Sequence, residues 1–265
     1  MFKKYKTPRK TIGQFEQVKP LLDIISVTKD DIEGLRKTIQ STGALRCCPS
    51  VKQIIIDSSS CAVSETVKEL ARSSNNIEYY RQEPAGIAAA FNLGLSHATS
   101  EWVWFLNGGD QIRADLKFDK ILYILSESRA DAIIFQNEVN GMKKILKHPP
   151  MWAMWPPLYA WIPHPATFSR RNLYEQFGNF DESFEIAMDF EFWIRCFSKQ
   201  VTVDTFSIPL TIYDKCGISS TQSGKTAHEA LRAINKHFWI IIQLWINNGM
   251  LIFKAWRSYI KRQKK

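Results

Sequence analysis

The sequence predicts an α/β fold in which a mostly parallel central sheet is flanked by helices on both faces. Between residues 21 and 106, short runs of β-branched, aliphatic and aromatic residues alternate with longer amphipathic segments. Parallel strands need crossover segments of that length, which are usually helices, so the alternation predicts a parallel sheet. Of the 265 residues, 45% are hydrophobic and 23% are charged, which favours a folded protein over a disordered one.

The expected elements follow one another along the chain. Strands are predicted at residues 21–28, 51–56, 77–81 and 102–106, with helices at 31–42, 63–73 and 86–98 between them. A helix is then expected at 116–126, strands at 132–136, 201–206 and 208–213, and helical structure from about residue 225 onward. The resulting division is a flexible basic arm at 1–20, an α/β domain at 21–215 and a helical extension at 216–265.

The stretch EWVWFLNGGD, residues 101–110, combines a buried strand with a glycine-rich turn that ends in Asp110. Asp57 likewise follows the strand at 51–56. Ligands of open parallel sheets bind outside the carboxyl ends of the strands, so both carboxylates are predicted to lie at one rim. Asp110 could bind a divalent cation there, and Asp57 a ribose or a base. The alternatives are an ordinary turn at 107–110 and a helix N-cap at 57–60.

Charge and cysteine content narrow the classes of function. The net charge of +9 favours an anionic partner, but the basic residues cluster towards the termini without a nucleic-acid recognition motif. The five cysteines are scattered and include no CxxC pair, which predicts a reducing compartment and no zinc site. The amino-terminal segment has no apolar signal-peptide core, so we expect a protein that is not secreted. Neither GxGxxG nor GxxxxGK[ST] follows a predicted strand, which argues against nicotinamide and P-loop chemistry.

Several motifs occur in an order that is typical of one family. These are IIIDSSS at 54–60, GIAAAFNLG at 86–94, ATSE at 98–101 and FLNGGD at 105–110. Together they resemble family 2 glycosyltransferases of GT-A fold, and in particular the bacterial polysaccharide-assembly branch. The resemblance extends over about residues 21–213. It implies a GT-A fold and a nucleotide-sugar site.

The resemblance also assigns roles to individual residues. It implies donor binding by Asp57, Gly86, Asn92 and Asn107, and binding of Mn²⁺ or Mg²⁺ by Asp110. Two departures from the family pattern weaken parts of this assignment. Asn107 stands where many relatives have an aspartate, and Ala89 and Phe91 replace charged side chains that are frequent in the helix at 86–98.

The segment 149–164 is rich in proline and aromatic residues, which excludes a regular helix or a central strand. A loop that carries so many aromatic rings could stack on a sugar acceptor, dock on lipid or pack on the domain. The predicted acceptor-binding residues are Trp152, Trp155, Tyr159, Trp161 and His164. His164 opens HPATFSRR, another segment that resembles the family; its Arg170 and Arg171 could neutralise a diphosphate or remain solvated.

Asp189 lies in GNFDESFEIAMDFEFWIR, residues 178–195, near the start of a predicted amphipathic helix. An acidic residue there could simply favour the helix dipole, by about 0.3–1 kcal/mol. The resemblance gives a sharper role, because Asp189 matches the position of the family's general base, with Glu191 as the fallback. A hydroxyl acceptor needs such a base, and inversion at the anomeric carbon is implied.

Residues 238–253 are nearly all apolar, and six basic residues with no acidic one follow in 254–265. The apolar run is shorter than the roughly 20 residues that a membrane span needs. A basic amphipathic helix flanked by tryptophans favours the surface of an anionic membrane. Packing of this helix on the domain, or on a second copy in a homodimer, is the alternative.

The combined expectation is a metal-dependent inverting glycosyltransferase on the cytoplasmic face of the inner membrane. Its donor would be a nucleotide sugar, with a UDP-sugar favoured, and its acceptor a polyprenyl-linked or free glycan of a surface polysaccharide. One alternative is a nucleotide-sugar-binding or scaffold protein of the same fold without turnover. A nucleotidyltransferase is the other, although residues 29–31, KDD, do not supply the basic nucleotide loop it needs.

Overall fold

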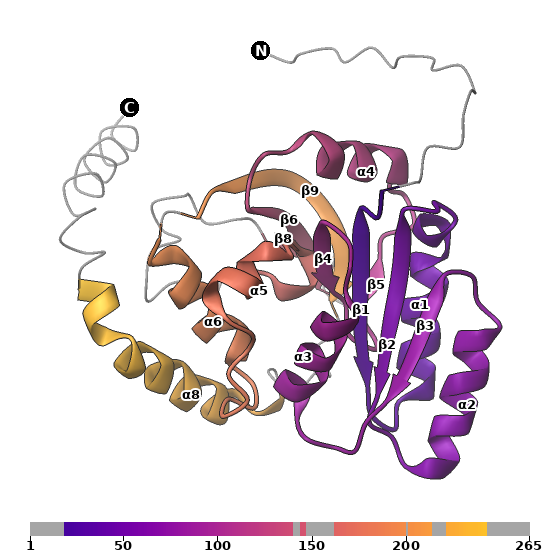
Figure 1. The fold of residues 1–265 in the computed structure, drawn as a ribbon, viewed down its shortest axis with the longest axis horizontal. Helices are drawn as coiled ribbons and strands as arrows, with labels where there is room; N and C mark the ends of the chain where they lie inside the picture. The colour runs from indigo at the N-terminus through magenta and orange to yellow at the C-terminus, as the bar shows by residue number, and fades with distance from the viewer. Residues whose placement is uncertain (1–18, 140–143, 147–161, 200, 214–220, 243–265) are drawn as a thin grey trace.

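The computed structural model describes residues 19–139, 144–146, 162–199, 201–213 and 221–242 (Figure 1). Within them, a nine-stranded sheet has the order β3-β2-β1-β4-β8-β6-β9-β5, and β7 pairs with β6. The strands are β1 (Leu22–Thr28), β2 (Val51–Asp57), β3 (Ile77–Arg81), β4 (Trp102–Phe105), β5 (Gln111–Ile112), β6 (Ala132–Val139), β7 (Lys144–Leu146), β8 (Thr167–Arg170) and β9 (Val203–Tyr213).

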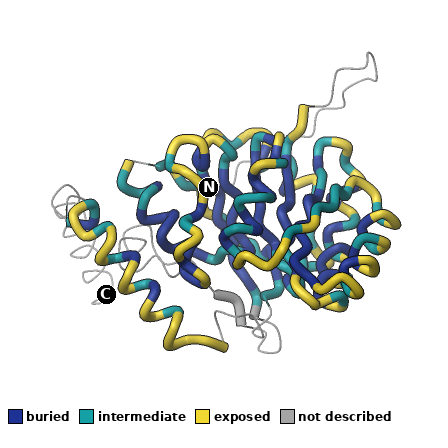
Figure 2. Tube along the Cα trace, turned by 60° about the horizontal axis from the view of Figure 1, so that its bottom comes forward, coloured by how far each residue is buried: buried dark blue, intermediate teal, exposed yellow. Residues whose placement is uncertain are grey.

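Helices cover both faces of this sheet, so the predicted α/β fold is confirmed. The helices are α1 (Ile32–Arg46), α2 (Cys61–Arg72), α3 (Ile87–His97), α4 (Phe118–Glu127), the 3₁₀ turn η3 (His164–Ala166), α5 (Asn172–Phe177), α6 (Met188–Phe197) and α8 (Ser223–Lys236). α3, α5 and α6 pack on one face, and α1, α2 and α4 on the other. Because both faces are covered, β1, β2 and β4 are buried along most of their length, as Figure 2 shows.

The amino-terminal half has the parallel pairing that the alternating pattern predicts. β1 pairs in parallel with β2 and β4, and β2 pairs in parallel with β3. β1, β2 and β3 are each followed by a helix. Asp31 is the N-cap of α1, and its Oδ1 accepts a hydrogen bond from Gly34 N at 2.8 Å. Gly94 lets α3 approach β1 closely, because a Cβ there would lie 2.5 Å from Ile25 Cγ2.

The carboxyl-terminal half of the sheet is mixed. β8 is antiparallel to both β4 and β6, and β5 is antiparallel to β9. The two strands expected at 201–206 and 208–213 form one strand, β9, which pairs in parallel with β6 through register shifts between Ile134 and Asn137. These irregularities accommodate Pro209, which has no backbone N–H to donate. β5, β7 and β8 were not predicted, because strands this short carry little periodicity.

A buried carboxylate connects β1 to the loop that leads into β4. Asp23 is fully buried, and its Oδ2 accepts hydrogen bonds from the backbone N–H groups of Thr99 (2.6 Å) and Ser100 (2.7 Å). Its Oδ1 accepts a third bond from Ser100 Oγ at 2.7 Å. Part of the ATSE motif at 98–101 therefore serves to hold β4 in register beside β1.

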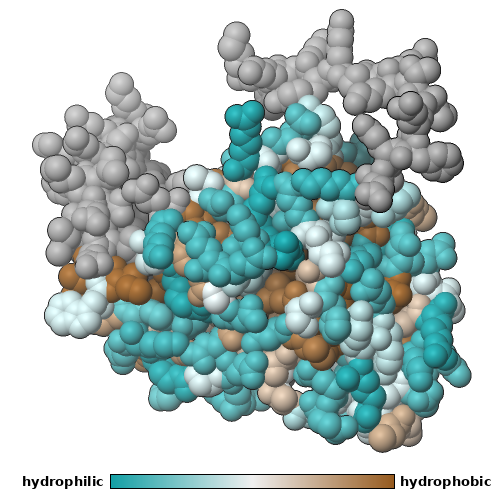
Figure 3. Space-filling model, in the orientation of Figure 1, coloured by the Kyte–Doolittle hydropathy of each residue, from teal (hydrophilic) through white to brown (hydrophobic). Residues whose placement is uncertain are grey.

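At the carboxyl-terminal side, α8 lies along α6 (Figure 1), and residues 238–242 continue in helical conformation. Ala233 and Ile241 are buried in the same hydrophobic cluster as α6, whereas Trp239 is 76% exposed. The face shown in Figure 3 is largely hydrophilic, and hydrophobic side chains are visible at its left edge, beside the carboxyl end of α8, and in patches near its centre. No helix among the described residues is long and apolar enough to cross a membrane.

Replacing Asp23 by asparagine is expected to lower the free energy of unfolding by about 1–3 kcal/mol, because a buried amide cannot accept all three hydrogen bonds. Urea denaturation followed by circular dichroism measures this change. Glu127→Gln, at the exposed end of α4, is the matched control and should leave the midpoint unchanged. A midpoint for Asp23→Asn equal to that of the wild type would contradict the assigned role.

Candidate functional site

The carboxyl ends of the parallel strands β1, β2 and β4 lie next to one another along one side of the sheet, which we call the site edge. Asp57, the last residue of β2, lies opposite Thr28, the last residue of β1. Asp57 is fully buried; its Oδ1 accepts a hydrogen bond from Ser59 N, and its Oδ2 accepts one from the Tyr79 hydroxyl, each at 2.9 Å. Burial, together with the Asp57 carboxylate, raises the pKa of Tyr79 to about 12, so the phenol keeps its proton and orients the carboxylate.

The turn after β4 is fixed by a threonine from α1. The Thr38 hydroxyl lies 2.8 Å from Asp110 O and 3.1 Å from Asn107 O, and it accepts a hydrogen bond from Gly109 N at 3.1 Å. Gly109 has a φ of +100°, a conformation that side chains other than glycine rarely adopt. The turn therefore has a defined shape, set by one buried hydroxyl and one glycine.

Oxygen atoms of this turn are of the kind that Mn²⁺ and Mg²⁺ prefer. Asn107 Oδ1 is buried and has no hydrogen-bond partner among the described residues, and the Asp110 carboxylate follows three residues later. Among the described residues, no group of three or more His, Cys, Asp or Glu side chains could hold a metal by itself. One carboxylate and one amide oxygen fit a hard cation that takes its remaining ligands from a bound diphosphate and water.

The structure brings two further predicted residues together at the same end of β4. His164 stacks on Phe91 and Phe105, with ring centroids 5.2 and 5.4 Å away, and Phe105 is the last residue of β4. His164 Nδ1 lies 3.6 Å from Asp189 Oδ2, and Asp189 is in the first turn of α6. Burial lowers the pKa of His164, although Asp189 acts in the opposite direction, so the imidazole is neutral near pH 7.

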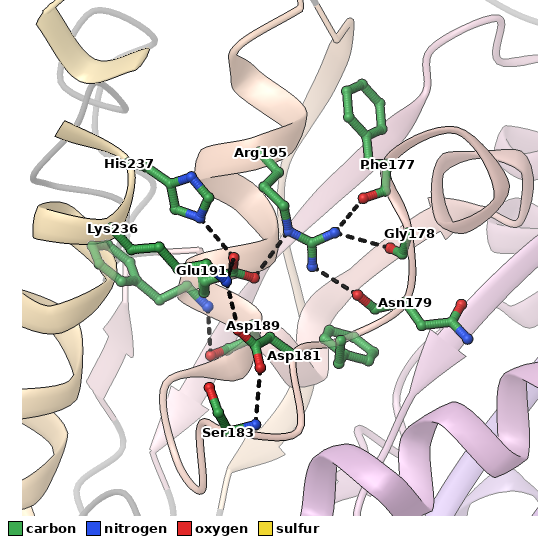
Figure 4. A network of polar contacts seen from close by, with 12 residues as sticks. Phe177, Gly178, Asn179, Asp181, Ser183, Asp189, Glu191, Arg195, Lys236 and His237 are labelled. Atoms are coloured by element: carbon green, nitrogen blue, oxygen red, sulfur yellow. Dashed lines mark hydrogen bonds and ion pairs between the residues drawn. The ribbon is translucent and has the colours of Figure 1, made fainter. Parts of the chain in front are cut away.

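Glu191, the fallback for the general base, is fully buried in a network of basic groups (Figure 4). Its carboxylate accepts hydrogen bonds from Arg195 Nε (2.9 Å) and Lys236 Nζ (3.0 Å) and lies 2.7 Å from His237 Nε2. Burial raises the pKa of Glu191, but these basic neighbours outweigh it and lower the pKa. A carboxylate so stabilised in its ionised form is a weak base.

Asn92 lies within α3, and Gly86 is the residue immediately before this helix. The Asn92 amide donates to Phe180 O and accepts from Phe180 N, both at 3.0 Å, and it also donates to Glu182 Oε1 at 2.8 Å. The side chain thus ties α3 to the segment before α6. Gly86 precedes α3 with a φ of +96°, and a Cβ at this position would meet no other atom within 4 Å.

Arg170 and Arg171 lie on the side of the sheet opposite the site edge, near the amino end of β4. Arg170 is opposite Trp102, at the amino end of β4, and its guanidinium contacts Glu101 and the carbonyls of Ser128 and Ala130. Arg171 contacts Glu175 and the Ser100 carbonyl. The structure therefore does not bring these arginines together with Asp57 and Asp110. Four predicted acceptor residues, Trp152, Trp155, Tyr159 and Trp161, lie outside the described residues.

Two residues that shape the site edge, Tyr79 and Thr38, were not identified as site residues from the sequence. Tyr79 lies in a short strand, and its contact with Asp57 depends on the β2–β3 register. Thr38 lies within α1, where a hydroxyl can bond to the preceding turn, and its Oγ1 is also 3.2 Å from Gly34 O. In the sequence, Thr38 lies between Leu35 and Ile39 on the apolar face of the predicted helix, and this position of a hydroxyl is the feature that could have indicated a buried contact.

Comparison with known proteins identifies relatives of this arrangement. Residues 23–197 match the sequence model of the family described as Glycosyl transferase family 2. Uncharacterized glycosyltransferase Rv1514c of Mycobacterium tuberculosis is 25% identical over 228 residues, which is 80% of this chain and 82% of that protein.

Solved structures share the fold at lower identity. TarS from S. aureus, in a crystal structure with UDP, has a TM-score of 0.60 and 17% identity over 80% of this chain and 64% of that one. Mannosyltransferase PcManGT from Pyrobaculum calidifontis, in complex with GDP-Man and Mn²⁺, has a TM-score of 0.54 and 15% identity over 73% and 57% of the two chains. This chain thus spans less than two thirds of either structure. The predicted GT-A fold is confirmed.

Replacing Thr38 by valine is expected to lower the free energy of unfolding by about 1–3 kcal/mol, because Gly109 N loses its acceptor inside the protein. Thermal or urea denaturation measures the loss. Thr66→Val, on the exposed side of α2, makes the same chemical change without that consequence and serves as the control. Similar effects of the two substitutions would show that the hydroxyl does not hold the turn.

Proposed function

Because this chain belongs to glycosyltransferase family 2, we propose that it transfers a sugar, with inversion, from a nucleotide-diphosphate sugar to a hydroxyl of a glycan acceptor. The observation that carries this proposal is the position of Asp189. Its carboxylate lies beside His164, which stacks on the last residue of β4, and the turn with Asn107 and Asp110 begins two residues later.

Asp189 acts as the general base in this proposal. It takes the proton from the acceptor hydroxyl while the oxygen attacks the anomeric carbon, and the bond from that carbon to the diphosphate oxygen breaks. The bonding electrons leave with the nucleoside diphosphate, and attack from the opposite side inverts the anomeric centre. Asp189 is partly exposed, with 28% of its side chain accessible, so a hydroxyl can reach it, whereas Glu191 has no exposed surface.

The donor is proposed to lie along the carboxyl ends of β1, β2 and β4. Asp57, oriented by Tyr79, would accept hydrogen bonds from the nucleoside, and Gly86 would allow close approach of the sugar or phosphate to the backbone. Asp110 and Asn107 would hold Mn²⁺ or Mg²⁺ together with the diphosphate. Such a cation, when bound, neutralises charge that develops on the leaving group. Asn92 would contribute by holding the segment that precedes α6.

The identity of the donor is proposed from proteins of the same fold. TarS binds UDP and PcManGT binds GDP-Man with Mn²⁺ in their crystal structures. We favour a UDP-sugar, because the TarS structure shares more of its fold with this chain. The acidic turn supplies only part of a cation's ligands, which is consistent with a cation that binds together with the diphosphate.

The acceptor is proposed to be a polyprenyl-linked or free glycan of a bacterial surface polysaccharide, elongated at the inner face of the cytoplasmic membrane. Phe238 and Trp239, which follow α8 directly after its C-cap His237, are 49% and 76% exposed, although both are large and apolar. Exposed aromatic rings followed by the basic sequence 254–265 suit an anionic membrane surface. The aromatic residues of 149–164 would bind the glycan by stacking on its sugar rings.

Asp189→Asn is expected to reduce kcat by about 10²–10⁴-fold, because an amide cannot take the proton from the acceptor. The assay is release of nucleoside diphosphate from a panel of nucleotide sugars in the presence of Mn²⁺ and extracted polyprenyl-linked glycan. Asp119→Asn, exposed at the start of α4, is the control. Undiminished transfer by Asp189→Asn would refute the base, and donor binding by the wild type without any turnover would favour a binding or scaffold protein.

Asp110→Ala is expected to weaken binding of the nucleoside diphosphate in the presence of Mn²⁺ by about 10- to 100-fold. This range corresponds to the loss of one contact to a charged group, roughly 1.5–3 kcal/mol. Calorimetric titration with and without Mn²⁺ measures the change, and Asp119→Ala is the control. If Mn²⁺ strengthens binding equally in Asp110→Ala and the wild type, the cation is held elsewhere.

A further inference from the structure

Three backbone N–H groups in the segment before α6 donate their hydrogen bonds to a side chain that is distant in the sequence. α6 follows Ala187, whose methyl group cannot cap a helix. The N–H groups of residues 185, 186 and 187 instead donate to one carboxylate, that of Glu229 in α8. Glu229 Oε1 accepts from Glu185 N at 3.1 Å, and Oε2 accepts from Ile186 N and Ala187 N, both at 2.9 Å.

This contact is buried and charged. Glu229 is only 5% exposed, and burial by itself raises its pKa, but the three N–H groups outweigh burial and lower the pKa. The carboxylate is therefore ionised at neutral pH and lies close to the positive end of the α6 dipole. An anion fixed by three N–H groups constrains the backbone more tightly than a surface ion pair does.

Other contacts of α8 extend along the same segment. Arg232 donates to Ser183 O at 2.6 Å, and its guanidinium lies 3.9 Å from the centre of the Phe184 ring. Lys236 forms ion pairs with Asp181 and Glu191, as drawn in Figure 4. From the opposite side, Asn92 binds the backbone of Phe180. Residues 180–187 are thus held between α3 and α8, and the segment leads directly into Asp189.

We propose that Glu229 is a positioning residue of the transfer reaction, which fixes the start of α6 and thereby the place of the Asp189 carboxylate. The inference rests on the proposed function of Asp189. Of the α8 side chains described above, Glu229 binds the backbone nearest to the base, since its last contact, Ala187 N, is two residues before Asp189. Displacement of a catalytic group by about 1 Å can reduce the rate by roughly 10²-fold, so this contact affects catalysis as well as stability.

The test uses Glu229→Gln in the full-length chain. The amide keeps the size of the side chain but places an N–H₂ group among three N–H donors. We expect kcat to fall by roughly 10- to 100-fold, with unchanged affinity for the nucleoside diphosphate in the presence of Mn²⁺. Hydrogen–deuterium exchange should become faster in the peptide that contains residues 183–190, which reports the lost contacts independently of turnover.

Lys225→Gln is the matched control, because Lys225 also joins α8 to this segment, through the exposed side chain of Glu185. It should retain wild-type kcat and exchange. If Glu229→Gln does not fold, Glu229→Asp, which keeps the charge but shortens the reach, takes its place with the same expectations.

Wild-type kcat in a folded Glu229 variant would overturn the positioning role, and so would a loss of kcat matched by an equal loss of donor affinity. The assays with wild-type protein and Asp189→Asn separate this result from failure of the proposed function. Active wild type with inactive Asp189→Asn and fully active Glu229→Gln would refute only the role of Glu229. Absence of transfer by the wild type would refute the proposed function itself.

Discussion

Parallel pairing of β1 with β2 and β4 is the constraint on which the candidate site depends. It brings three carboxyl strand ends to one edge, where Asp57 lies opposite Thr28 and the turn with Asp110 follows Phe105. Because side chains alternate along a strand, a slip by one residue would turn every buried side chain to the wrong face. The fully buried Asp23 carboxylate helps to prevent such a slip, since it connects β1 to the loop before β4.

The amino-terminal half of the fold was predictable from the sequence because its strands are covered on both faces. Full coverage favours apolar runs such as Ile54–Ile56 and Trp102–Leu106, and a polar residue, Asp57 or Asn107, follows directly after each of these two runs. The positions of Asp57 and Asp110 at a common edge follow from that pattern. The motifs that indicated the family include residues that support the fold: Gly94 allows close packing of α3 on β1, and Asn92 holds the backbone of Phe180.

Other parts of the site could not be predicted, because they depend on strand direction and on contacts distant in sequence. β8 runs antiparallel to β4, so η3, which precedes β8, brings His164 to the site edge, whereas Arg170 at the end of β8 reaches the opposite edge. Nothing in HPATFSRR indicates that its two ends separate in this way. Glu191 is the fallback base that the family resemblance suggests; its basic partners Lys236 and His237 come from the carboxyl-terminal side of the chain, and no local pattern indicates this contact.

α8 lies beyond residues 23–197, the portion that matches the family, yet it supplies the acceptor for three backbone N–H groups within that portion. The region that matches the family therefore ends before the structure that packs with it ends, because α8 is bonded to residues inside that region. In chimeric enzymes built from relatives of this chain, residues 180–187 and α8 would have to be exchanged as a single module. A graft that ends at residue 197 would separate the Glu229 carboxylate from the three main-chain N–H groups that donate to it.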